Sequence, residues 1–476
     1  MKKYVILRMT FTTEELVSLL DSIRIFLDET EIKQKKLLHV SLPFSIHDPL
    51  AVLETIPNSE FSFFWERPDL DVSITAGGTA ISIEGQHLSK EDLLKQVTYW
   101  RNNLYSFGTT DHSLAAPFFV GGMAFSQDSK PEIWKKFGKL KLTAPEWTFV
   151  RNGKYALLNI SVVIDESSDK DEVHTYLNDT INKFSKRVET LKDATPEPDK
   201  LNYFVSSETS FDVWENGIKK AKEYFDEGIA EKLVLARELD VTANRIIEPT
   251  RFINKLRSVY PSCYSFIVHL PNGPTFLGSS PERLVSFHKN YILTEALAGT
   301  ISRGKSAKED TFLEQSLLNS QKDLVEHSIV VSEILKRLKP FSSEIQVSEK
   351  PGVRKVANVQ HLHTPITAWI HHKTELLNLF FELHPTPAVG GYPKEVAKVL
   401  VPKLEDFDRG WYAAPVGWFN LSGSGEFAVA IRSGIIWENK ARFYAGCGIV
   451  PDSDPMKEWD ETKLKFIPML SALEFA

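Results

Sequence analysis

The stretch Phe276-Leu277-Gly278-Ser279-Ser280-Pro281-Glu282-Arg283-Leu284 carries the clearest structural signal in the chain. It predicts a strand that runs into a tight Gly-Ser-Ser-Pro turn, with Glu282 directly after the proline. Such a turn can hold a carboxyl group rigidly over a cleft. Partial desolvation would then keep Glu282 protonated, so that it could act as a general acid. The alternative interpretation is an ion pair between Glu282 and a nearby arginine.

A second strand, Lys232-Leu233-Val234-Leu235-Ala236-Arg237, is apolar on both faces and is therefore expected to be buried. Burial disfavours the charged form of a lysine, which suits Lys232 to the role of a general base. The alternative is that Lys232 lies at the start of the strand and extends its ammonium into solvent.

Strands are expected on both sides of the charged, proline-containing segment 188–203. Strand-like runs precede it at 61–65, 116–120 and 155–160, and an amphipathic helix over 211–225 follows it, with Gly228 placed to end that helix. Regular βαβ alternation, a G-x-G-x-x-G motif and a P-loop are all missing, which argues against a Rossmann fold and nucleotide-driven chemistry. We expect one large α+β body, to which region 1–200 contributes together with region 201–476.

Composition excludes several classes of protein. The chain has 476 residues, 42% of them hydrophobic and 25% charged, with a formal net charge of −7 and two cysteines. This is globular composition without a basic run or a disulfide framework, so neither a nucleic-acid partner nor a cysteine-rich zinc site is expected. No apolar run is long enough to span a membrane. Because Arg8 interrupts the apolar N-terminal stretch, we expect that stretch to form the first strand and helix of a cytoplasmic protein.

Two acidic pairs share one spacing. Asp323 and Glu326 lie in a helix predicted over 316–338, and Glu458 and Glu461 lie in a helix that Asp454 could cap, with Pro455 at its first position. Each i,i+3 pair places two carboxylates on one helix face. Two such faces opposed would form an oxygen-only site for a hard cation, typically Mg²⁺. The alternative is two solvated helix faces.

Arg432 stands in an apolar strand predicted over 427–434. A buried arginine needs an anionic partner, and its planar fork suits a carboxylate. That partner could be a ligand or an internal acid. Two strands rich in small residues, 294–300 and 444–450, can present backbone N–H groups to an anion at close range.

Together these motifs resemble those of the chorismate-utilising enzymes, which include isochorismate, salicylate, anthranilate and aminodeoxychorismate synthases. The motifs occur in the order K-L-V-L-A-R, G-S-S-P-E-R-L, T-E-A-L-A-G-T, K-D-x-x-E-H, N-V-Q-H-L, H-P-T-P-A-V-G-G, A-V-A-I-R-S, A-G-x-G-I-V and S-D-P-x-x-E-W-x-E. They cover approximately residues 205–476, and their order makes the resemblance specific. The resemblance implies a two-layered antiparallel β-sheet sandwich with outer helices.

The resemblance also implies a role for each candidate residue. Lys232 matches the base that activates water, and Glu282 matches the acid that protonates the departing hydroxyl of chorismate. Glu326 and Glu461 match direct Mg²⁺ ligands, while Asp323 and Glu458 match carboxylates that act mostly through metal-bound water. The remaining substrate-site positions are Gly299, Thr300, His361, Ala388, Tyr412, Arg432, the Gly446 backbone and Lys465.

Within this family the chain is most similar to isochorismate synthases, which convert chorismate to isochorismate. Ammonia-using members carry glutamine where this chain has Lys232, and salicylate synthases typically carry threonine at the position of Ala388. The chain has no glutaminase-like G-x-C-x-G motif, and we expect no glutaminase partner. The length of region 1–200 favours the menaquinone-pathway type. The alternatives are a salicylate synthase, an aminating subunit that needs a separate glutaminase, and a chorismate-binding protein without turnover.

Overall fold

The computed structural model describes residues 12–44, 48–85, 89–126, 132–190, 200–356, 359–371 and 376–476. Two predictions fall partly outside these ranges. Residues 191–199 of the predicted boundary segment are not described, and neither is the strand expected before residue 12. Within the described part, no helix is both long enough and apolar enough to cross a membrane.

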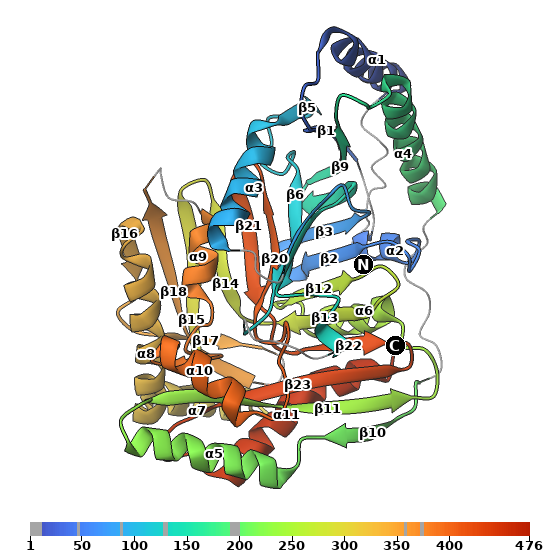
Figure 1. The fold of residues 1–476 in the computed structure, drawn as a ribbon. Coiled ribbons are helices and arrows are strands. Elements are labelled where there is room, and N and C mark those ends of the chain that lie inside the picture. The colour runs from blue at the N-terminus through green and yellow to red at the C-terminus, as the bar shows by residue number, and fades with distance from the viewer. Residues whose placement is uncertain are drawn as a thin grey trace.

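The larger of two β-sheets contains strands from both halves of the chain. It has thirteen strands, and β19 (Gly391–Tyr392) pairs with β11 outside the main order. The yellow-green strands β12 and β13 lie beside the blue strands β2 and β3 in Figure 1, where β12 pairs with β2. The main order is β10 (Tyr203–Glu208), β11 (Lys232–Ala243), β23 (Lys440–Ile449), β22 (Ser433–Trp437), β13 (Thr275–Ser280), β12 (Tyr264–His269), β2 (Ser62–Arg67), β3 (Val72–Gly77), β8 (Trp147–Asn152), β9 (Tyr155–Ile164), β1 (Lys36–Pro43) and β5 (Leu104–Gly108).

The second sheet has ten strands and is antiparallel, as is the first sheet apart from the parallel pair β1–β5. Strand β17 (Gly352–Lys355) pairs with β18 outside its main order. The two sheets enclose a common core, in which Trp65 and Phe276 of the first meet Val416 and Phe427 of the second. The main order is β16 (Ser342–Val347), β18 (Val359–Ile370), β15 (Tyr291–Ser302), β14 (Arg283–His288), β21 (Ser424–Val429), β20 (Pro415–Asn420), β6 (Phe118–Met123), β7 (Leu140–Ala144) and β4 (Ile81–Glu84).

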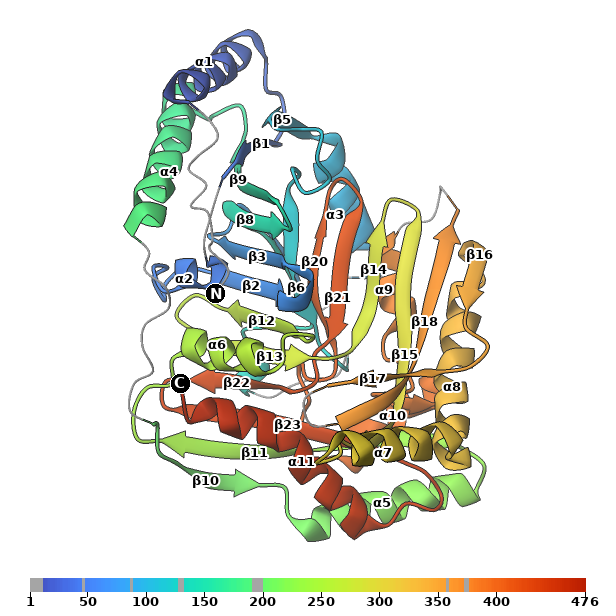
Figure 2. The ribbon, with the colours of Figure 1, turned by 180° about the vertical axis from the view of Figure 1, so that it is seen from behind.

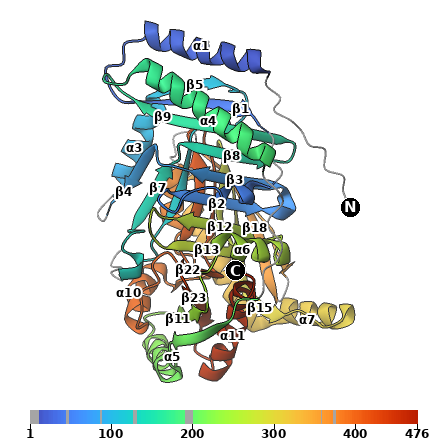
Figure 3. The same cartoon turned by 90° about the vertical axis from the view of Figure 1, so that its right-hand side faces the viewer.

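Helices cover the outside of this sandwich. Helix α8 packs on β15 and β18, α11 on β23, and α5 and α10 on β11. Figure 3 shows α1 and α4 together at one end of the molecule and α5 and α11 at the other. The expected α+β sandwich with outer helices is therefore confirmed. The helices are α1 (Thr13–Glu29), α2 (Pro49–Leu53), α3 (Lys90–Asn102), α4 (Lys170–Thr190), α5 (Phe211–Asp226), α6 (Pro249–Val259), α7 (Ala307–Asn319), α8 (Gln321–Leu338), α9 (Leu376–Leu383), α10 (Lys394–Leu404) and α11 (Pro455–Leu473).

Two of the points at which the chain passes from one sheet to the other lie next to each other. Strand β13 belongs to the large sheet and β14 to the smaller one, so the turn at Pro281–Glu282 is a crossing between sheets. The segment between β21 and β22 crosses in the opposite direction and carries Arg432. The two crossings are hydrogen-bonded to each other, because Val429 N donates to the Glu282 carbonyl at 3.0 Å and Ser279 N donates to the Arg432 carbonyl at 3.0 Å. Figure 2 shows this junction from behind, where β13 and β22 approach β14 and β21.

The structure corrects two predicted elements. The strand predicted over 427–434 ends at Val429, and the backbone of Arg432 has a φ of 51°, in the left-handed region that a strand cannot contain. The helix predicted over 316–338 is two helices that meet at Ser320. Ser320 ends α7, and its hydroxyl accepts the backbone N–H of Asp323 at the start of α8.

Candidate active site

A cavity of about 310 Å³ opens beside the junction of the two sheets. Strands β11, β15, β18 and β23, helices α8 and α11, and both sheet crossings contribute to its wall. Every predicted site residue lines it except Lys232. The predicted residues found there are Glu282, Gly299, Thr300, Asp323, Glu326, His361, Ala388, Tyr412, Arg432, Gly446, Glu458, Glu461 and Lys465.

Lys232 contacts Glu326, which lines this cavity. Its side chain is 1% exposed, and its Nζ donates to Glu326 Oε1 at 2.6 Å. The interpretation that Lys232 extends into solvent is therefore wrong. Within the sheet, β11 is flanked by β10 and β19 on one side and by β23 on the other. Gly448 allows this arrangement, since a Cβ there would lie 2.9 Å from Lys232 Cε.

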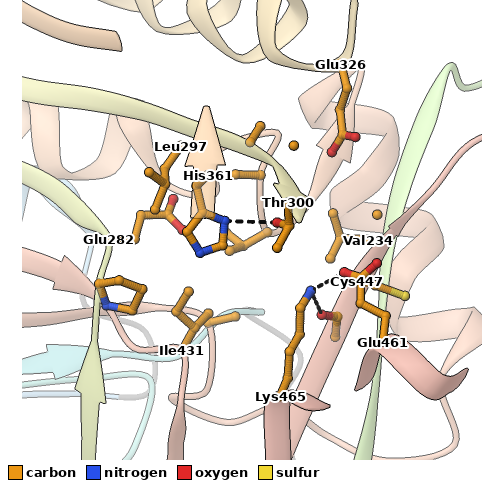
Figure 4. Close-up of a pocket in the computed structure, with 18 of the residues that line it drawn as sticks. Val234, Glu282, Leu297, Thr300, Glu326, His361, Ile431, Cys447, Glu461 and Lys465 are labelled. Carbon is orange, nitrogen blue, oxygen red and sulfur yellow. Dashed lines mark hydrogen bonds and ion pairs between the residues drawn. The ribbon is translucent and has the colours of Figure 1, made fainter. Parts of the chain in front are cut away.

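Glu282 is buried at the sheet crossing, and its carboxyl group is only weakly hydrogen-bonded. Its side chain accepts a hydrogen bond from Thr386 Oγ1 at 3.4 Å, and the adjacent Arg283 pairs with Glu426 instead, with its Nε 3.1 Å from Oε1. Burial and the negative charge of Glu295 raise the pKa of Glu282 to about 8. The carboxyl group therefore keeps its proton at neutral pH, as a general acid must. In the view of Figure 4, Glu282 lies on one side of the cavity and Glu326 and Glu461 lie on the other.

Helices α8 and α11 bring four carboxylates to this cavity. Glu326 pairs with Lys232, and Glu461 pairs with Lys465 at 2.6 Å. Among the described residues, no group of three His, Cys, Asp or Glu side chains is close enough together to hold a metal ion. Burial raises the pKa of Glu458, and the neighbouring Glu461 raises it further. In its donor chemistry, this all-carboxylate set fits a hard divalent cation.

A group of cationic and neutral hydrogen-bonding residues, here called the cationic wall, also lines the cavity. Arg432 lies in the crossing after β21, and burial lowers its pKa, although an arginine remains charged in proteins. Burial raises the pKa of Tyr412, so that its hydroxyl stays protonated and can donate. Lys465 Nζ donates to the Gly446 carbonyl at 2.8 Å as well as to Glu461. These groups can bind an anion.

His361 and Thr300 form a neutral pair in the same cavity. His361 Nδ1 lies 2.9 Å from Thr300 Oγ1, a contact drawn in Figure 4. Burial, with nearby Arg432 and Lys465, lowers the pKa of His361 to about 3. The imidazole is therefore uncharged at neutral pH, and this pair can exchange hydrogen bonds with a ligand but cannot pair with a carboxylate as a cation.

Two charged residues that line the cavity were not predicted from the sequence. Arg409 forms a buried pair with Glu405 and donates to the carbonyls of Val389 at 2.9 Å and Val234 at 2.7 Å. It thereby joins β11 to the segment that holds Ala388. The i,i+4 spacing of Glu405 and Arg409 was the available signal. Lys322 also lines the cavity and adds a cation, but an isolated lysine beside Asp323 gives no distinguishing pattern.

Comparisons with known proteins agree with this geometry. The family model described as chorismate binding enzyme matches residues 21–474. The chain belongs to the chorismate-binding enzymes. It is 32% identical over 418 residues to isochorismate synthase MenF of Bacillus subtilis, covering 86% of this chain and 87% of that protein. It is 34% identical over 431 residues to the salicylate biosynthesis isochorismate synthase of Pseudomonas aeruginosa, covering 90% and 88% of the two chains.

Solved structures of the family share the fold. MenF, the menaquinone-specific isochorismate synthase from Escherichia coli, superposes with a TM-score of 0.76 at 26% identity, covering 96% of this chain and 99% of that one. Anthranilate synthase component I from Streptococcus pneumoniae has a TM-score of 0.67 at 21% identity over 84% and 92% of the chains, which shows the fold alone. The predicted membership of the chorismate-utilising enzymes is confirmed.

Proposed function

We propose that this chorismate-binding enzyme is an isochorismate synthase, which adds water at C2 of chorismate and releases the C4 hydroxyl. The observation that carries the proposal is the placement of Glu282, a carboxyl group held neutral by burial, across the cavity from Glu326, which in turn pairs with Lys232. An acid and a base on opposite sides of the ring are what the reaction requires. The two relatives named as isochorismate synthases support it, since each aligns over most of both chains.

The proposed chemistry needs two proton transfers. Lys232 removes a proton from the water that attacks C2, and Glu282 donates a proton to the C4 hydroxyl, which leaves as water. The double bonds of the ring shift as the new C–O bond forms and the old one breaks. Overall one water is consumed and one is released, so no oxidant, reductant or nucleotide takes part.

We propose Mg²⁺ as the cofactor, with Glu326 and Glu461 as ligands and with Asp323 and Glu458 as further carboxylates around it. When bound, the ion would neutralise the ring carboxylate of chorismate and help to fix the ring in place. Such neutralisation matters because chorismate carries two carboxylates and the chain has a formal net charge of −7.

The other substrate carboxylate is assigned to the cationic wall. Arg432 and Lys465 supply charge, the Tyr412 hydroxyl and the Gly446 backbone supply hydrogen bonds, and all four line the cavity. Gly299, Thr300 and His361 complete the substrate site as neutral polar groups. Ala388 provides a small surface where salicylate synthases typically carry threonine, which favours release of isochorismate without loss of pyruvate.

We further propose that the isochorismate serves menaquinone synthesis. The similarity to the MenF proteins of Bacillus subtilis and Escherichia coli over most of their length supports this pathway. Deletion of the gene in its own organism should then remove menaquinone from the membrane lipids. Unchanged menaquinone together with loss of a catechol or salicylate product would assign the enzyme to another pathway.

The direct test is identification of the product. Purified protein is incubated with chorismate and Mg²⁺, with an EDTA control, and the products are separated and identified by NMR. We expect a mixture of chorismate and isochorismate that depends on the added metal. Salicylate with pyruvate would identify a salicylate synthase instead, and a product formed only with ammonia would identify an aminating enzyme. Unchanged chorismate in all reactions would refute turnover.

A further inference from the structure

One buried ion pair holds the backbone on both sides of Glu282. Glu295, in β15, accepts hydrogen bonds from Arg354 Nη1 at 2.6 Å and from Arg354 Nη2 at 2.7 Å. Arg354 Nη1 also donates to the carbonyl of Pro281, the residue before Glu282, at 3.2 Å. Glu295 Oε1 accepts the backbone N–H of Arg283, the residue after Glu282, at 3.1 Å. Both peptide groups that flank the proposed acid are therefore bonded to the same pair.

Glu295 carries a permanent negative charge at this place. Its side chain is 2% exposed, and His363 Nε2 lies 2.9 Å from its Oε2. Burial raises the pKa of Glu295, but hydrogen bonds from His363 and Arg354 outweigh burial and hold that pKa well below its usual range. An ionised carboxylate only accepts hydrogen bonds, so the contacting nitrogen of His363 carries a proton.

We propose that Glu295 and Arg354 are positioning residues for Glu282, fixing both the direction of its carboxyl group and its charge state. This inference rests on the proposed role of Glu282 as the acid of an isochorismate synthase. We refer to Glu295 and Arg354 together as the Glu282 clamp. The clamp gives β15 and β17 a function in the reaction although neither residue lines the cavity.

The physical reason is the coupling of two buried carboxyl groups. When one of two neighbouring carboxyls is held ionised, ionisation of the other costs more free energy, and their pKa values move apart. The groups that act on Glu282 come from four elements: Glu295 of β15 opposes its ionisation, while Lys232 of β11, Arg354 of β17 and the Thr386 hydroxyl after α9 favour it. Burial and Glu295 together outweigh the other three.

The test replaces the charge of Glu295 while keeping its shape. Glu295→Gln retains an oxygen that can accept from Arg283 N and Arg354. We expect the alkaline limb of the kcat/KM profile, which reports the free enzyme, to move down by about one pH unit, because the charge that opposes ionisation of Glu282 is removed. At pH 8 the protonated fraction of Glu282 would fall from about one half to about one tenth. The KM for chorismate should stay within about twofold, since Glu295 does not touch the cavity.

Substitution of Arg354 should move the alkaline limb in the opposite direction. Arg354→Gln removes a cation and leaves Glu295 without its bidentate partner, so the alkaline limb should move up while kcat at the optimum falls, because the Pro281 carbonyl loses its donor. Arg354→Lys restores the charge and should return the limb toward its wild-type position. A role in folding alone would lower the amount of active protein and leave the pH profile where it was.

Glu426→Gln is the matched control. Glu426 is a half-buried carboxylate with its side chain 12% exposed, and it pairs with Arg283 Nε at 3.1 Å and with the Tyr264 hydroxyl at 2.8 Å. It is not among the groups that raise the pKa of Glu282. The control should therefore keep the wild-type alkaline limb. An alkaline limb in Glu295→Gln that matches both wild type and the control would overturn the clamp while leaving the isochorismate synthase assignment intact.

A second measurement does not depend on activity or on the clamp variants folding. Infrared spectroscopy of the wild-type protein at neutral pH should show a carboxylic-acid C=O band that is missing in Glu282→Gln. If this band is missing from the wild-type protein at neutral pH, Glu282 is ionised and the charge role of the clamp is refuted. If the band is present but wild type makes no isochorismate, the proposed function fails and the electrostatic inference stands.

Discussion

Glu282→Gln should abolish turnover and yet stabilise the folded protein at neutral and alkaline pH. Glutamine has nearly the shape of glutamate but has no proton to donate to the leaving hydroxyl. Loss of a general acid typically costs about 10²- to 10⁴-fold in rate, so we expect a decrease of that size in kcat. The stability effect has the opposite sign, because burial makes the ionised form of Glu282 costly.

The magnitude follows from the two pKa values of Glu282. The folded-state pKa of Glu282 is about 8, and the ordinary pKa of a glutamate carboxyl, taken for the unfolded chain, is 4.5. Between these values the folded protein holds a proton that the unfolded chain releases, so stability falls as pH rises through this window and levels off above it. At pH 7 the cost is about 3 kcal/mol, at about 1.4 kcal/mol per unit. The glutamine of the variant avoids this cost, but its buried N–H donors lack partners, which costs about 1–2 kcal/mol. The free energy of unfolding of the variant should therefore exceed that of wild type by roughly 1–2 kcal/mol at pH 7.

The assay is urea denaturation of wild type and variant at pH 4.5, 6 and 8, followed by the midpoint of unfolding. Relative to wild type, the midpoint of Glu282→Gln should rise with pH, from below the wild-type value at pH 4.5 to above it at pH 8. Glu295→Gln serves as a second comparison: the lowered pKa of the Glu295 carboxyl stabilises the fold above about pH 4.5, so the deficit of this variant should be present at all three pH values and shrink only in more acidic medium. A difference between Glu282→Gln and wild type that does not change with pH would refute a protonated Glu282.

Three further variants probe the rest of the site. Lys232→Met should retain chorismate binding, measured by titration calorimetry, and lose at least about a hundredfold in kcat; near-wild-type turnover would remove Lys232 as the base. Gly448→Ala places a methyl group 2.9 Å from Lys232 Cε, so kcat should fall while the circular dichroism spectrum stays native, and unchanged kcat would show that Lys232 tolerates displacement. Glu461→Gln should raise the Mg²⁺ concentration for half-maximal activity by about tenfold or more, and an identical Mg²⁺ titration would reject Glu461 as a ligand.

Local patterns predicted the elements that carry the site. A continuous apolar run located the buried strand that begins at Lys232, and the Asp454-Pro455 cap located the start of α11, where Asp454 accepts from Lys457 N at 3.0 Å. The i,i+3 spacing correctly placed both acidic pairs on faces that meet one cavity. These features depend on a few neighbouring residues, which is why sequence alone reveals them.

Other features depend on contacts between distant segments. The apolar run around Arg432 looks like one strand, but it leaves the smaller sheet at Val429 because Ser280 and Glu282 of the other crossing take up its backbone groups. The Glu282 clamp likewise joins residues 59 apart in the sequence. The Lys232–Glu326 pair spans 94 residues. No periodicity marks such partners, because the tertiary fold and not local propensity brings them together.

The most direct test of the proposed reaction is the source of the new oxygen. The enzyme is incubated with chorismate and Mg²⁺ in water enriched in the heavy isotope of oxygen, and early products are analysed by mass spectrometry and NMR. We predict isochorismate that carries one heavy oxygen, located in the C2 hydroxyl, and no such product with Glu282→Gln. Isochorismate that contains only the original oxygens would contradict the addition of water by Lys232 and the loss of the C4 hydroxyl through Glu282.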